Sequence, residues 1–87
     1  MTTKPPSATA QFAQDSLEAI AYRSVQGIPA RETNDLNRLG YSVWAWLKER
    51  KGTLEEAVMN SGVRTDLSIP EVSARVREKL KQEDISF

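Results

Sequence analysis

Apolar residues recur every three or four positions along most of this chain, which is the spacing of an amphipathic helix. Four such segments follow a short stretch of small and polar residues that contains two prolines. The first segment spans residues 9–26, with Thr9 as a candidate N-cap and Gly27 placed to end the helix. Its inner positions are Ala13, Leu17, Ile20 and Ser24, with Phe12 and Ala21 beside them. We therefore expect a flexible arm over residues 1–8 and a single helical domain over residues 9–87.

The second segment is the longest and ends near Lys51. Its start has two interpretations: Pro29 occupies the first helical position, or Thr33 or Asn34 caps a later start. The apolar stripe that should face the core consists of Leu36, Leu39, Val43 and Leu47. Gly40 falls on this same face, where the missing side chain would let another helix approach closely.

The third and fourth segments each begin with a capping box, in which a Ser or Thr precedes a Glu by three residues. Thr53 pairs with Glu56 in the third segment, which Gly62 ends, and Ser68 pairs with Glu71 in the fourth. Their inner positions are Leu54, Ala57, Val58 and Ser61 in the third, and Ile69, Val72, Val76 and Leu80 in the fourth. No segment combines sustained alternation with a hairpin turn. The predicted fold class is therefore all-α, a compact bundle of three to four helices.

The composition removes most of the chemistry that enzymes use near neutral pH. The chain contains no histidine and no cysteine. Histidine is the side chain that titrates between about pH 5 and 8, and cysteine supplies the reactive thiolate. Ser-His catalysis, Cys-His catalysis and an ordinary zinc site therefore cannot be built. With no Gly-rich phosphate loop either, we expect no enzymatic activity, no cofactor and no metal site.

The charges and the apolar runs limit the partners and the location. Twelve basic residues balance twelve acidic ones, so the chain lacks the positive field that is typical of nucleic-acid-binding proteins. No apolar run follows Lys4, so the N-terminus does not have the pattern of a secretory signal. The strongly apolar stretch over residues 43–47 is too short to span a bilayer. We expect a soluble cytoplasmic protein that does not enter a membrane.

Aromatic residues gather in the middle of the second segment. At about 100° per residue, Trp46 lies on one flank of the core stripe and Trp44 on the other, with Tyr41 turned further toward solvent. We predict that Trp46 packs in the core. Tyr41 and Trp44 allow two interpretations: they are also core residues, or they form an exposed patch for a partner. Tyrosine and tryptophan are enriched at the energetically dominant positions of protein interfaces.

From this patch we predict a small, non-catalytic protein-binding module that acts as a regulator, inhibitor or adaptor. Its size and simplicity are typical of proteins encoded by bacteria, plasmids or phages. The binding surface is centred on Tyr41 and Trp44, joined by Met59 and Phe87. Its partner is another protein, or a second copy of the chain in a homodimer.

The alternative is a DNA-binding transcriptional regulator. The order of a long helix, a short capped helix and a basic helix resembles a helix-turn-helix or winged-helix module, which implies phosphate contacts from the fourth segment. The candidate residues are Arg64, Arg75, Arg77, Lys79 and Lys81. Ala57 and Gly62 are further apart than the small residue and the turn glycine of such modules, and the connection over residues 62–67 is long. Five acidic residues also balance the five basic ones over residues 64–87, which makes nucleic acid the secondary prediction.

Overall fold

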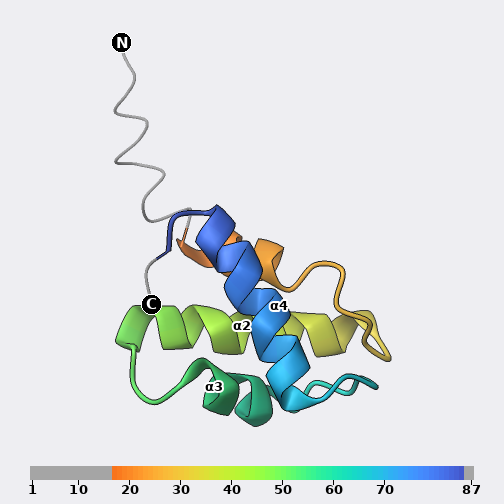
Figure 1. The fold of residues 1–87 in the computed structure, drawn as a ribbon. Helices are drawn as coiled ribbons and strands as arrows, with labels where there is room; N and C mark the ends of the chain where they lie inside the picture. The colour runs from red at the N-terminus through yellow and green to blue at the C-terminus, as the bar shows by residue number, and fades with distance from the viewer. Residues whose placement is uncertain (1–16, 86–87) are drawn as a thin grey trace.

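The computed structural model describes residues 17–85, and all its regular structure is helical (Figure 1). The elements in this range are a helix over residues 17–24, α2 (Thr33–Glu49), α3 (Leu54–Ser61) and α4 (Ile69–Gln82). This arrangement confirms the all-α class and the compact bundle that the sequence predicts. The predicted arm over residues 1–8 and the predicted helix start at Thr9 lie outside the described residues.

The helices surround one apolar core. In the view of Figure 1, α2 runs through the middle, α3 lies below it, and α4 crosses in front. The predicted inner positions that fall within residues 17–85 are buried or pack against this core, whereas Phe12 and Ala13 lie outside the described residues. The buried core residues are Ile20, Ala21, Val25 and Ile28, Leu39, Val43 and Leu47, Leu54 and Val58, and Val72, Val76 and Leu80. Leu36 and Ile69, which the sequence places on the same stripes, are partly buried and pack against this core. Burial of these apolar side chains is the main source of stability in a chain without disulfides.

Gly40 shows why a side chain is missing from the inner face of α2. Gly40 is buried, and the ring of Tyr22 occupies the space where a Cβ atom at position 40 would lie. The close approach that the sequence predicts for this face is therefore confirmed, and the neighbour is the helix over residues 17–24.

The start of α2 differs from both sequence interpretations. The helix does not begin at Pro29, and neither Thr33 nor Asn34 caps it, because Thr33 is already its first helical residue. Glu32 is the N-cap, and its backbone N–H donates to Oδ2 of Asp35 at 3.0 Å. The helix ends slightly earlier than predicted, with Arg50 as a left-handed C-cap at φ 55°.

The predicted capping boxes of α3 and α4 are both confirmed. The hydroxyl of Thr53 accepts from the backbone N–H of Glu56 at 3.1 Å, and the backbone N–H of Thr53 donates to Glu56 Oε1 at 2.9 Å. Ser68 and Glu71 exchange the same two bonds at 3.3 and 3.2 Å. Gly62, with φ 70°, ends α3 where the sequence expects it.

Candidate functional site

A groove lies between α2 and α3, on a part of α2 that does not face the core. It consists of two adjoining hollows of about 450 and about 300 Å³, which share Ser42, Ala45 and Asn60. The first hollow also contacts Arg38 and Tyr41, and the second extends to Trp46, Glu49 and Ala57. We call the two hollows together the α2–α3 groove. Its shared walls are small side chains, so the backbones of two helices lie close to its surface.

Helical spacing places one row of α2 residues along this groove. Arg38, Ser42, Ala45 and Glu49 are three or four residues apart and fall within an arc of about 60°. The row lies on roughly the opposite side of α2 from Val43, which is fully buried. The hydroxyl of Ser42 donates to the backbone carbonyl of Ala57 at 2.6 Å and so joins the two walls of the groove. The row is therefore presented by a helix that the core already holds in place.

Tyr41 lines the groove, and its ring contacts the ring of Trp44. The Tyr41 residue is 59% exposed, and its ring meets the Trp44 ring edge-to-face at 5.7 Å between centroids. Trp44 is only partly buried and packs against the core, while Nζ of Lys48 lies 4.0 Å from the centroid of its ring. Tyr41 is therefore exposed rather than part of the core, and Trp44 is intermediate between the two.

Trp46 is less buried than the sequence predicts. It packs against the core but is only partly buried, and its indole lines the groove. Its Nε1–H donates to the carbonyl of Gly52 at 3.2 Å, and the guanidinium of Arg50 lies 5.2 Å from its ring centroid. The core prediction for Trp46 therefore holds only in part. The reason is that its polar edge is used to fix the connection between α2 and α3.

The other two residues of the predicted patch are placed differently. Met59 is 60% exposed on α3, next to Asn60, which lines the groove. Phe87 lies outside the described residues. The structure thus brings Tyr41 and Trp44 into contact, and it adds a groove that the sequence analysis did not identify.

Some basic residues of the predicted DNA surface form contacts within the fold, and others are exposed on α4. Arg64 is paired with Asp35, and Nη2 of Arg77 bonds both carboxylate oxygens of Glu55 at 3.1 and 3.2 Å. Lys79 donates to the backbone carbonyl of Gln26 at 3.4 Å. Arg75 and Lys81 are exposed on α4. Three of the five predicted cations are therefore engaged within the fold.

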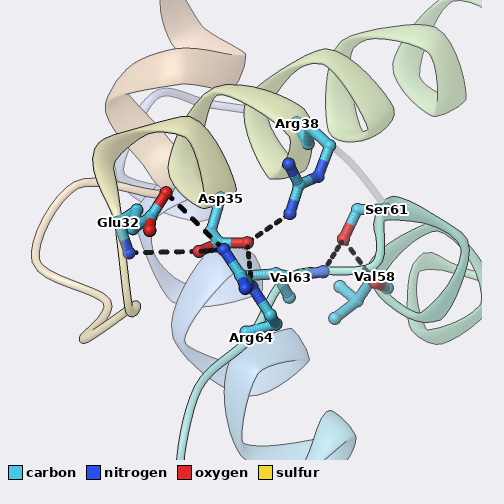
Figure 2. Close-up of polar contacts among 7 residues, drawn as sticks. All are labelled: Glu32, Asp35, Arg38, Val58, Ser61, Val63 and Arg64. Carbon is cyan, nitrogen blue, oxygen red and sulfur yellow. Dashed lines mark hydrogen bonds and ion pairs between the residues drawn. The ribbon is translucent and has the colours of Figure 1, made fainter.

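Asp35 forms the centre of a buried polar network at the start of α2 (Figure 2). Its carboxylate accepts from Arg64 Nε at 3.1 Å and Nη2 at 3.2 Å, from Nη2 of Arg38, and from the backbone N–H of Glu32. The hydrogen bonds from Arg64, with smaller help from Glu32 and Arg38, lower the pKa of Asp35 below its usual value, although burial acts to raise it. The backbone N–H of Arg31 also donates to the carbonyl of Arg64 at 2.9 Å. The network thus attaches the α3–α4 connection to the start of α2.

Figure 2 also shows how α3 ends beside this network. The hydroxyl of Ser61 donates to the carbonyl of Val58 at 2.6 Å and accepts from the backbone N–H of Val63 at 3.2 Å. These bonds turn the chain toward Arg64, so the end of the groove nearest Arg38 is built from ordered polar contacts.

The described part of the chain was compared with the requirements of a metal cluster and of a membrane span. Within residues 17–85, no group of three acidic, His or Cys side chains could hold a metal ion. No helix in the same range is both long and apolar enough to cross a bilayer. Comparisons with known protein families, with curated proteins and with solved structures found no match.

Proposed function

We propose that this chain is a non-catalytic protein-binding module that acts as a regulator, inhibitor or adaptor through the exposed side of α2. One observation carries the proposal: Tyr41, a large residue that is 59% exposed, lines a groove whose centre is formed by the small side chains of Ser42 and Ala45. A groove of this kind can admit a partner side chain or a helix, and Tyr41 supplies an anchor beside it. Trp44 contacts Tyr41 beside the groove, and Met59 adds a large exposed apolar side chain on the neighbouring helix α3.

The side chains of Tyr41 and Trp44 are restrained by their contacts, and this restraint favours binding. Trp44 is held by the core, and its ring meets Tyr41 edge-to-face. Lys48 lies over the Trp44 ring at 4.0 Å and restricts it further. An anchor that is already restrained loses less side-chain entropy when a partner immobilises it. Removal of its apolar area from water then contributes about 25 cal/mol per Å².

The DNA-binding alternative has weaker support. Arg64 and Arg77 form ion pairs with Asp35 and Glu55, so their contacts with phosphates would compete with contacts that hold the fold. Arg75 and Lys81 are exposed on α4, and the whole chain carries no net charge. A cytoplasmic location belongs to the proposal, because a chain without cysteine gains nothing from an oxidising compartment.

A comparison of two matched variants tests the proposal. Tyr41→Ala removes the anchor, and Arg75→Ala removes an exposed cation on α4. Each is used as bait for proteins and for random duplex DNA, with helix content checked by circular dichroism. We expect Tyr41→Ala to weaken a protein complex at least about tenfold and Arg75→Ala to leave it unchanged.

The opposite pattern supports the alternative. If duplex DNA binds, if binding falls steeply with added salt, and if Arg75→Ala rather than Tyr41→Ala abolishes it, then α4 is the functional surface. A protein complex that survives Tyr41→Ala would also overturn the assignment of the α2 surface.

A further inference from the structure

We infer that the partner in the α2–α3 groove is a second copy of this chain, whose α2 lies antiparallel to the first. The inference rests on the proposed function, because it names the partner of the same surface. It follows from the order of residues along the row Arg38, Ser42, Ala45 and Glu49, which is complementary to itself when it is reversed.

The reversal can be followed residue by residue. Arg38 precedes Ser42 by four residues, and Glu49 follows Ala45 by four. A twofold axis that passes between Ser42 and Ala45 therefore places Arg38 of one copy beside Glu49 of the other. Because a twofold interface uses the same patch on both copies, this pair forms twice. A parallel arrangement would instead place Arg38 against Arg38.

Both charged residues are accessible for these pairs. The Arg38 side chain is 41% exposed, and one of its nitrogens bonds Asp35 while a guanidinium carries five N–H donors. Glu49 is exposed at the end of α2. Arg38 can therefore contact Glu49 of a second copy while its bond to Asp35 is kept. Opposite charges placed in this way fix the register of an interface.

The centre of the row suits a close helix–helix contact. Ser42 and Ala45 are small, so two α2 helices can approach to about 8 Å between axes. The Ser42 hydroxyl already donates to the Ala57 carbonyl, so its donor stays satisfied when water is removed. The indole N–H of Trp46 is bonded to Gly52 in the same way.

The same symmetry keeps each aromatic side chain on its own flank of the interface. Tyr41 and Trp46 lie on opposite flanks of the row, so Tyr41 of one copy shares a flank with Tyr41 of the other. The chain has no net charge, so two copies do not repel each other, and so small a domain gains from burying further surface.

Charge-reversed variants, alone and mixed, test the inference. Sedimentation equilibrium over a series of protein concentrations measures how strongly each one dimerises. We expect the wild type to dimerise and Glu49→Arg to weaken the dimer at least about tenfold, because Arg38 would then face an arginine. Arg38→Glu should weaken it by the same logic. An equimolar mixture of the Glu49→Arg and Arg38→Glu chains should form a heterodimer, since each pair across the interface is again opposite in charge. Glu78→Arg, an equal charge change on exposed α4, is the matched control and should leave the dimer intact.

Cross-linking gives a second measurement, because Arg38→Glu also faces Asp35 and can disturb the fold. The chain contains no cysteine, so introduced thiols are unique. With a short thiol-reactive linker, a mixture of Arg38→Cys and Glu49→Cys chains should cross-link. Neither variant should cross-link to itself, because the two copies of position 38 would lie about 16 Å apart along the helix. Self-linking of Arg38→Cys would mean a parallel arrangement and overturn the inference.

The outcomes separate this inference from the proposed function. A wild type that stays monomeric up to about 1 mM overturns the second copy as partner, since a dimer of that Kd would be half formed there. If the monomer still binds another protein in a Tyr41-dependent way, the proposed function stands without this inference. A dimer that Glu49→Arg and Ala45→Arg both leave unchanged uses a different surface, which also overturns the inference.

Discussion

The two sides of α2 have opposite relations to the fold. On the inner side Leu39 and Val43 are fully buried, and even the space beside Gly40 is filled by Tyr22. On the groove side Ser42 and Ala45 leave a hollow, and Tyr41 is exposed. One helix thus carries a side that stabilises the protein and a side on which the exposed residue Tyr41 can be changed at little cost in stability. Substitutions on the two sides should therefore separate stability from binding.

The largest effect is expected on the inner side. Leu39→Ala removes a fully buried side chain and should lower the free energy of unfolding by about 2–5 kcal/mol. Tyr41→Ala, on the other side of the same helix, should change it by no more than about 0.5 kcal/mol. Urea denaturation followed by tryptophan fluorescence measures both. Equal losses in the two variants would mean that the groove side also holds the fold.

The second-largest effect is expected at the polar start of α2. Asp35→Asn removes the charge that two guanidiniums bond, and the loss in stability at pH 7 should be smaller than that of Leu39→Ala. Asparagine has nearly the same shape, so the variant isolates the charge. Thermal unfolding monitored by circular dichroism gives the Tm of each variant.

The sign of the pH dependence sharpens this prediction. The hydrogen bonds from Arg64 lower the pKa of Asp35 in the folded state below its ordinary value of 3.8. The unfolded state therefore binds more protons between these two values, and stability is lost as the pH falls through them. The wild type should lose stability below about pH 4, and its advantage over Asp35→Asn should shrink there. An advantage that stays constant down to pH 2 would contradict the ion-pair network.

A feature of the inner side can be predicted from the sequence when the residues that form it are close together in the chain. The stripe around Val43 and the two capping boxes follow from residues three or four positions apart, so the sequence alone shows them. The start of α2 also uses residues three positions apart, because the backbone N–H of Glu32 donates to Asp35. By local preference Thr33 or Asn34 is the better cap, and the sequence does not show that Asp35 also pairs with Arg64, which is 29 residues away in the chain.

The groove side was predictable only in part. Tyr41 could be placed toward solvent from its angle on the helix, and its exposure agrees. The row from Arg38 to Glu49 has helical spacing, but its centre consists of small residues that give no hydrophobic signal. The groove exists only where α3 packs against α2. One contact between the two helices is the hydrogen bond from Ser42 to the carbonyl of Ala57, 15 residues further along the chain. The sequence therefore shows the anchor but not the hollow beside it.

A smaller effect on the inner side comes from Gly40→Ala. Alanine favours a helix interior over glycine by about 1 kcal/mol, so a gain is expected where space allows. Here the added methyl meets the ring of Tyr22, and overpacking of this kind costs about 1–3 kcal/mol. We expect a net loss of about 1 kcal/mol in urea unfolding. Gly40→Ala combined with Tyr22→Ala should recover the helix-propensity gain relative to Tyr22→Ala alone, and an additive result would contradict the contact.

The smallest effect is expected in α3, which forms one wall of the groove. Here a loss of stability can be distinguished from a loss of binding. Thr53→Ala removes the cap of α3, which has eight residues, and should cost about 1 kcal/mol. Ser68→Ala removes the same kind of cap from α4 and should cost a similar amount. Because α3 forms a wall of the groove and α4 does not, Thr53→Ala should weaken binding at the groove while Ser68→Ala leaves it unchanged. If the two caps alter binding equally at equal stability, the wall that α3 provides is not part of the binding surface.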